Sequence, residues 1–185
     1  EVVCDGKKAA ELAMQHLFSL GHERIAYIGD CSFESRYVGY CDMLIRKSLP
    51  LNYELIRQTD QSREAAKAAV NDLLANRSLK SGAFDAIFCA NDDSAIGVLE
   101  QLQAHKKSLR HTPISVISID DIEEAQNTKP FLTTIHIPRQ EMSHMAVLLL
   151  LDRIAGGHSR PVRSEFACRL IQRLSCYPCT TWQAR

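Results

Sequence analysis

The feature that most constrains the fold is a series of short apolar runs, each followed by a segment of helical periodicity. Continuous runs cover residues 24–29, 86–90 and 115–119, and weaker ones cover 55–58 and 132–137. Strands buried on both faces show no polar alternation, and parallel strands need long crossover connections between them. The sequence therefore predicts an α/β fold in which helices cover both faces of a mainly parallel sheet.

Local signals define the helices between these runs. Apolar residues three or four apart predict the helices, and Gly21 ends the first of them in the manner of a helix C-cap glycine. Two further strands are expected, a short one at residues 2–4 and an alternating one at 163–170 that completes the sheet. The expected helices cover residues 7–20, 35–47, 63–75, 92–104 and 140–155.

Composition narrows the classes of function. The chain has 185 residues, with 22 Lys plus Arg balanced by 22 Asp plus Glu. A nucleic-acid-binding domain usually shows a basic excess, which is lacking here. The longest apolar run, Ala146 to Leu151, is too short to span a bilayer, and the first residues lack a secretory apolar region. We therefore expect no membrane partner.

The seven cysteines are odd in number and scattered in spacing, which is not typical of a secreted disulfide framework. We therefore expect a reducing cytoplasm. Cys176 and Cys179 form a C-x-x-C pair, but a zinc site needs a second pair or two suitably spaced histidines, and His158 stands alone. We expect neither a metal site nor a cofactor.

Polar residues follow two of the apolar runs directly. Asn91 and Asp92 follow residues 86–90, and Asp120 and Asp121 follow residues 115–119. In parallel sheets ligands bind outside the carboxyl ends of the strands, so the two pairs can converge on one ligand. The alternative is that Asp92 caps a helix and Asp120 lies in a turn, and both roles are common.

Six sequence blocks resemble, in order, the effector-binding domain of the LacI/GalR family of bacterial transcriptional regulators. The blocks are LFSLGHERIA (17–26), RYVGY (36–40), DAIFCAND with AIG (85–97), ISVISIDD (114–121), PFLTTI (130–135) and LIQRLS (170–175). The resemblance implies a Rossmann-like subdomain of the periplasmic-binding-protein-like (type I) fold, together with part of a second subdomain.

The resemblance also implies the effector-binding residues, namely Arg36, Asn91 and Asp120. A carboxylate, an amide and a planar guanidinium suit a hydroxylated ligand, because together they accept and donate several hydrogen bonds. The alternative for Arg36 is a surface ion pair on a helix. Further candidates to line the site are Asp92, Gln61 and Phe33.

Three positions depart from the family pattern. Ile119 replaces the usual aromatic residue before the first Asp of the block, Gln61 stands where many relatives carry a sugar-stacking aromatic, and Ile137 replaces a frequent Gln. An aromatic stacking surface would then have to come from Phe33, Tyr27 or Tyr37.

The matched blocks begin partway into the family's first effector-binding subdomain, so we expect a C-terminal piece of a longer protein whose helix-turn-helix domain is absent from this sequence. Residues 22–134 and 158–178 are expected to form the C-terminal subdomain. Residues 1–21 and 135–157 are expected to be a remnant of the N-terminal one. The hinges are expected near Gly21 and between residues 134 and 138.

These features favour a transcriptional regulator, most consistent with a repressor, of an operon for a sugar or another small metabolite. The expected partners are a small-molecule effector and a second copy in a homodimer, with operator DNA bound only through the missing domain. The alternative is a periplasmic-type sugar-binding protein. An enzyme is disfavoured because Asp92-Asp93 and Asp120-Asp121 accompany no nucleophile motif or phosphate-binding loop.

Overall fold

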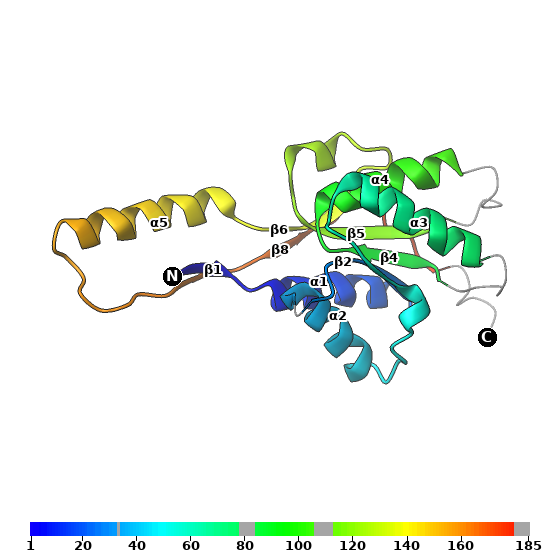
Figure 1. The fold of residues 1–185 in the computed structure, drawn as a ribbon, viewed down its shortest axis with the longest axis horizontal. Coiled ribbons are helices and arrows are strands. Elements are labelled where there is room, and N and C mark those ends of the chain that lie inside the picture. The colour runs from blue at the N-terminus through cyan, green and yellow to red at the C-terminus, as the bar shows by residue number, and fades with distance from the viewer. Residues whose placement is uncertain (33, 78–83, 106–112, 180–185) are drawn as a thin grey trace.

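The computed structural model of the protein describes residues 1–32, 34–77, 84–105 and 113–179. In these ranges the chain forms a six-stranded sheet, helices on both of its faces, and a helix that projects away from it (Figure 1). The helices are α1 (Gly6–Ser19), α2 (Ser35–Arg46), α3 (Arg63–Arg77), α4 (Asp92–Ala104) and α5 (Arg139–Ile154). The strands are β1 (Val2–Cys4), β2 (Ile25–Gly29), β3 (Ile56–Gln58), β4 (Ala86–Cys89), β5 (Ser115–Asp120), β6 (Thr133–His136), β7 (Ser164–Phe166) and β8 (Arg169–Ile171).

The large sheet has the strand order β3-β2-β4-β5-β6-β8. The first five strands are parallel, and β8 runs antiparallel to β6 at the edge. The predicted α/β fold with a mainly parallel sheet is therefore confirmed. The antiparallel edge strand is an addition that the sequence pattern did not indicate.

The central strands are buried on both faces, which explains why they carry no polar alternation. In β4, Ala86 and Phe88 pack with α1 and α2, whereas Ile87 and Cys89 pack with α3 and α4. The four helices accordingly form two layers, one on each side of the sheet (Figure 1). Each apolar side chain of such a strand contributes to one of two cores.

The alternating segment at residues 163–170 is not one strand, as the sequence pattern predicted, but two strands in different sheets. β7 pairs in parallel with β1, through Cys4 opposite Phe166, in a separate two-stranded sheet. β8 pairs with β6 in the large sheet, through His136 opposite Arg169. Alternation shows that one face of a strand is buried, but it does not show which strand it pairs with. The pattern therefore could not reveal this division.

Helix α1 packs on the large sheet, and its expected place in the N-terminal remnant is wrong. Its buried alanines face α2, where a Cβ on Gly39 would come within 2.8 Å of the Lys7 carbonyl oxygen. Gly21 therefore lies within the six-stranded unit and not at a hinge. The buried residues of α1 are Ala9, Ala10, Ala13, Met14, His16 and Leu17.

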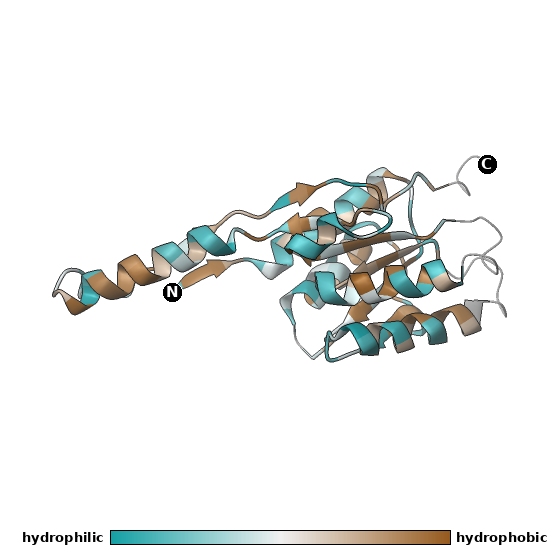
Figure 2. Cartoon of the chain, turned by 90° about the horizontal axis from the view of Figure 1, so that it is seen from above, coloured by the Kyte–Doolittle hydropathy of each residue, from teal (hydrophilic) through white to brown (hydrophobic). Residues whose placement is uncertain are grey.

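Helix α5 stands apart from both cores (Figures 1 and 2), and none of its 16 residues is buried. The structure thus confirms a helix close to the predicted limits and leaves its apolar side chains uncovered. Among the described residues, no helix has both the length and the apolar character needed to span a membrane. The exposed stripe consists of Val147 (54%), Leu150 (59%), Leu151 (56%) and Ile154 (73%).

We expect the 185-residue chain to self-associate through this stripe, because a contiguous apolar patch of this kind is seldom left in water. Replacing Val147 and Leu151 together by Glu places two charges on the stripe and should shift the protein toward monomer at tens of micromolar (~10–100 μM). Sedimentation velocity measures this change. A control carrying Ala68→Glu and Asn71→Glu, on the exposed side of α3, should associate like the parent chain, and a monomeric parent chain would contradict the expectation.

Candidate functional site

The carboxyl ends of β2, β4, β5 and β6 lie at one end of the large sheet, because these four strands are parallel neighbours. We call this end of the strands the carboxyl edge, which is distinct from the edge strand β8. Polar residues lie at or just after the end of each of these strands, and helices α2 and α4 start there. The residues that the sequence singled out after β4 and β5 are therefore brought together, as predicted. This edge leads directly into α5 through residues 137–138.

Arg36 lies in the first turn of α2, which Glu34 caps by accepting the backbone N–H groups of Arg36 and Tyr37. The guanidinium crosses the edge of the sheet. Its Nη1 donates to the carbonyl oxygen of Ala90 at 2.7 Å, and its Nη2 lies 3.8 Å from Oδ1 of Asp120. The side chains of Arg36 and Asp120 are 25% and 20% exposed. Both can therefore still meet a ligand.

Asn91 is the N-cap residue of α4. Its Oδ1 accepts the backbone N–H of Ser94 at 3.0 Å, and its Nδ2 donates to the carbonyl oxygen of Gln61 at 3.1 Å. The capping role that was an alternative for Asp92 belongs to Asn91 instead. Gln61 has a positive φ of 65° and meets Asn91 through its main chain. Asn91 thus joins the start of α4 to the loop before α3.

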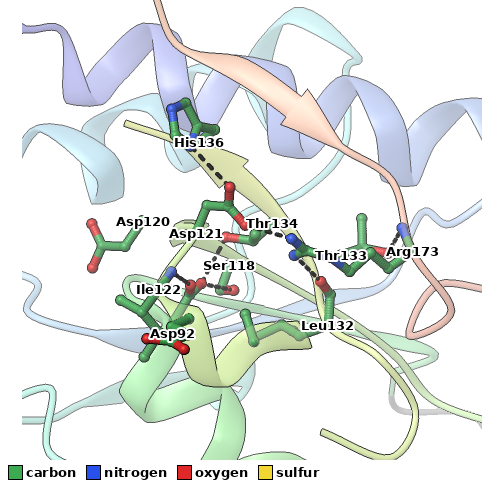
Figure 3. Close-up of polar contacts among 12 residues, drawn as sticks. Asp92, Ser118, Asp120, Asp121, Ile122, Leu132, Thr133, Thr134, His136 and Arg173 are labelled. Atoms are coloured by element: carbon green, nitrogen blue, oxygen red, sulfur yellow. Dashed lines mark hydrogen bonds and ion pairs between the residues drawn. The ribbon is translucent and has the colours of Figure 1, made fainter. Parts of the chain in front are cut away.

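Asp120 ends β5 with a φ of 134°, and Asp121 follows at 59°. In Figure 3 the two carboxylates point in different directions, so that Asp120 faces away from the contacts that hold Asp121. Burial raises the pKa of Asp120, although the nearby charges of Arg36 and Arg139 oppose this. Arg139, at the start of α5, donates to the main-chain oxygen of Asp120 at 3.1 Å.

Asp92 was a candidate to line the site, but the structure places it in the interior with no exposed surface. Its carboxylate accepts from Ser118 Oγ at 2.5 Å, Thr134 Oγ1 at 2.6 Å and the backbone N–H of Ile122 at 2.8 Å (Figure 3). Burial raises the pKa of Asp92, and these donors oppose that rise. Asp92 therefore holds the edge of the sheet together from inside.

A second polar cluster at this edge was not predicted from the sequence. Asp121 pairs with Arg173 Nη2 at 2.6 Å and with His136 Nδ1 at 2.9 Å (Figure 3). Arg173 Nη1 also donates to the carbonyl oxygen of Leu132 at 2.8 Å. Burial alone would raise the pKa of Asp121, but the donors on Arg173 and His136 lower it by more. The second Asp of the pair therefore ties β5 to both β6 and the segment after β8.

The aromatic candidates do not supply an obvious stacking surface. Phe33 lies outside the described residues. Tyr27 is wholly buried in the core, with its ring centre 5.5 Å from that of Phe88, so its candidacy is wrong. Tyr37 is half-buried and packs 5.2 Å from Tyr27. Among the described residues, hydrogen-bonding side chains therefore predominate at this edge.

The exposed chemistry of the edge suits a neutral, hydroxyl-rich ligand. A guanidinium donates in a plane, a carboxylate accepts from two hydroxyls, and an amide does both. Among the described residues, the group whose donor atoms are close enough to share a metal ion is His22, Asp85 and Cys179, at the other end of the strands. The carboxyl edge and that group are separate features.

Comparisons with known proteins agree with this geometry. Residues 14–176 match the periplasmic binding protein-like domain family. The chain is 32% identical over 177 residues to the transcriptional regulator AscG of Escherichia coli K12. This alignment covers 93% of this chain and 51% of AscG. It is 33% identical over 176 residues to the repressor CytR of the same strain, covering 91% of this chain and 49% of CytR. The chain thus spans about half the length of these relatives.

Solved structures agree with these sequence comparisons. A LacI-family transcriptional regulator from Enterococcus faecium with bound ribose superposes with a TM-score of 0.85 at 28% identity, over 97% of this chain and 66% of that one. The complex of the regulator CelR with cellobiose superposes with a TM-score of 0.84 at 27% identity, over 95% of this chain and 53% of that one. The fold and the arrangement of its elements are therefore those of this group of sugar-complexed regulators.

Replacing Asp121 by Asn should destabilise the protein by roughly 1–3 kcal/mol at pH 7, because it weakens charge-assisted hydrogen bonds to Arg173 and His136. The pKa of Asp121 in the folded protein lies below its ordinary value of 3.8. Its contribution is therefore present above that pH and is lost as the pH falls further, through the folded pKa. Urea unfolding at several pH values measures the difference between the two proteins.

The control for this comparison is Asp72→Asn, whose carboxylate also pairs with an arginine, Arg57, at 2.6 Å but is 58% exposed. That change should cost less than about 1 kcal/mol. If Asp121→Asn were equally mild at pH 7, or if its effect persisted unchanged in acid, the contribution assigned to this cluster would be wrong.

Proposed function

The chain belongs to the periplasmic binding protein-like domain family and, within it, to the effector-binding domains of LacI-family transcriptional regulators, and from this premise we propose that the protein is a transcriptional repressor controlled by a small sugar-like effector. The observation that supports the proposal is the position of three polar residues at the carboxyl ends of neighbouring strands: Arg36 lies 3.8 Å from Asp120 and donates to the carbonyl oxygen of Ala90, the residue before Asn91. We assign the effector-binding roles to these three side chains.

The effector class follows from the groups at this edge and is supported by the relatives. Two similar regulators are named with a bound sugar, ribose in one and cellobiose in the other. A site built to hydrogen-bond hydroxyls rejects analogues that lack them, since its buried polar groups would be left unpaired. We therefore expect a sugar or a related metabolite to be preferred over an apolar compound.

We propose a revised division into subdomains. The six-stranded unit, residues 5–136 with 169–179, would form the C-terminal effector-binding subdomain. Strands β1 and β7 with α5 would belong to the N-terminal subdomain, because they pair with each other and lie outside both cores of the large sheet. The three connections between these units are near Asp5, residues 137–138 and residues 167–168. The effector would then bind between the two subdomains.

We extend the proposal to partners and location. A homodimer would cover part of the exposed stripe of α5, and operator DNA would contact a helix-turn-helix segment outside this sequence, since the chain carries no net charge. The cysteine content favours a cytoplasmic protein over a periplasmic sugar-binding protein. An enzymatic role is disfavoured because Asp92 is buried and fully hydrogen-bonded.

Replacing Asp120 by Ala in the full-length protein should abolish the response to the effector while leaving operator binding intact. The lost acceptor is worth roughly 1.5–3 kcal/mol, or about a 10- to 100-fold loss of affinity. A panel of pentoses, hexoses and disaccharides is first screened by thermal shift, and calorimetry with the best ligand then measures affinity.

The matched control is Asp93→Ala, which removes a neighbouring carboxylate that is 55% exposed and paired with Arg63. This variant should bind the effector normally. Unchanged affinity in Asp120→Ala would remove Asp120 from the site, and equal losses in both variants would point to a general effect of charge.

Effector binding should also bring the two subdomains together, because a ligand held between them favours the arrangement in which both contact it. Small-angle scattering from the full-length protein should therefore show a smaller radius of gyration when the effector is saturating. Asp120→Ala at the same effector concentration should keep the larger radius. Identical scattering from the parent protein with and without effector would contradict closure.

A further inference from the structure

A buried polar cluster lies at the amino ends of the strands, on the side of the sheet away from the carboxyl edge. His22 precedes β2, Asp85 precedes β4 and Ser115 begins β5. Cys179 reaches the same place from the C-terminal segment, which its backbone N–H anchors to the carbonyl oxygen of Leu20 at 2.8 Å. His22, Asp85 and Cys179 are only 2%, 7% and 9% exposed.

The donor atoms of three of these residues converge. His22 Nδ1 lies 2.8 Å from Asp85 Oδ1, and Cys179 Sγ lies 3.6 Å from Asp85 Oδ2. The imidazole nitrogen, a carboxylate oxygen and the sulfur all lie within 4.8 Å of one another. A ring nitrogen, an oxygen and a sulfur from three different parts of the chain therefore surround one point.

Both ring nitrogens of His22 have partners within the cluster itself. Nδ1 lies 2.8 Å from Asp85 Oδ1, and Nε2 lies 2.8 Å from the carbonyl oxygen of Tyr177 and 2.9 Å from Ser115 Oγ. In one tautomer a hydrogen on Nδ1 joins the ring to the carboxylate. In the other, Nε2 donates to the Tyr177 carbonyl and Nδ1 turns its lone pair toward Asp85, so a cation between these two acceptors would take the place of that hydrogen.

We propose that this cluster binds a zinc ion through His22 Nδ1, Asp85 Oδ1 and Cys179 Sγ. Zinc takes imidazole, carboxylate and thiolate ligands in a tetrahedral arrangement, and three protein ligands leave a fourth position for water. Hydrogens on the ring and on the thiol can fill the His22–Asp85 and Cys179–Asp85 contacts. Zinc would replace both hydrogens at once, because all three ligand atoms lie close enough to share one ion.

The residues around the cluster provide the outer contacts that zinc ligands usually have. A metal-bound histidine normally donates its second N–H to a carbonyl or carboxylate, and Tyr177 supplies the carbonyl. The remaining carboxylate oxygen, Asp85 Oδ2, accepts from Arg24 Nη2 at 3.1 Å. Ser115 Oγ accepts the backbone N–H of Tyr177 at 2.8 Å and so holds that carbonyl in place.

The cluster also has a route to solvent. A hollow of about 510 Å³ is lined by His22 and Cys179 together with Gly21, Glu23 and Lys47. A metal ion can enter from this hollow, and a water in it can take the fourth coordination position. The cluster is therefore both buried and reachable.

Only one cysteine of the C-x-x-C motif takes part. Cys176 Sγ instead donates to the carbonyl oxygen of Val116 at 3.2 Å, and Cys176 does not belong to the group of convergent donors. The expectation of no metal site rested on the lack of a second cysteine pair in the sequence. The fold supplies the other two ligands from residues 157 and 94 positions earlier, at the ends of two strands.

Zinc here would fix the C-terminal segment to the amino ends of β2 and β4. The experiment titrates metal-free, reduced, full-length protein with zinc(II) against a chromophoric chelator and follows thermal unfolding in parallel. The parent protein should bind one tight equivalent and unfold at a higher temperature with zinc. His22→Gln and Cys179→Ser should weaken binding by roughly 100-fold or more, since even outer-contact partners contribute 10–100-fold.

Cys176→Ser is the matched control and should keep the tight equivalent, because it changes the same motif without touching the convergent donors. A parent protein without a tight equivalent, or binding that survives both His22→Gln and Cys179→Ser, would overturn the proposal. Equal loss in Cys176→Ser would overturn it in favour of the cysteine pair. Cobalt(II) added to the unmodified protein gives a check that does not depend on the variants folding: thiolate-to-cobalt charge-transfer absorption is expected, and its absence counts against the site.

Discussion

The arrangement of the carboxyl ends of the strands, where we propose that the effector binds, depends on one buried carboxylate, that of Asp92. Its two oxygens take hydrogens from Ser118 on β5, Thr134 on β6 and the main chain of Ile122 in the loop that follows β5. An ionised carboxylate without such partners would be very costly in the interior. Removing it would leave the two buried hydroxyl donors unpaired, at about 1–3 kcal/mol each, and would free the partly buried N–H of Ile122. The start of α4 is thereby fixed to both neighbouring strands and to the loop.

This fixed loop determines which way the two following carboxylates point. Asp121, with a φ of 59°, lies in the left-handed region that Asp tolerates better than most residues, whereas Asp120, with a φ of 134°, has a conformation that residues with a side chain rarely adopt. The turn directs Asp120 toward Arg36 and Asp121 toward Arg173 and His136. One carboxylate is left available for a ligand while its neighbour holds the strands together. The site is therefore positioned by rigid elements before any ligand arrives, which reduces the ordering that binding would require.

The elements of the fold could be predicted from the sequence because burial on both faces and helical spacing leave direct patterns, as in residues 86–90 and 92–104. The choice of partners could not, because such patterns record burial without naming the neighbour. For that reason the sequence pattern places α1 in the wrong unit and predicts a single strand over residues 163–170. The same limit applies to the site. Asn91 and Asp92 are both polar in the sequence, but Asn91 caps α4 whereas Asp92 is buried and accepts hydrogen bonds from Ser118 and Thr134. Only the packing of Ser118 and Thr134 separates these two roles.

The sizes of the interaction energies indicate where coupling between the proposed effector and α5 would lie. Arg139 makes a direct link by donating to the main-chain oxygen of Asp120, but a single hydrogen bond of this kind contributes only about 0.5–1.5 kcal/mol. Shifting a two-state protein from 1:99 to 99:1 takes about 5.5 kcal/mol of differential binding. The link through Arg139 is therefore too weak to act alone. In the proposed mechanism the larger share would come from ligand contacts that form only when the second subdomain approaches, and the three chain connections would set the path of that approach.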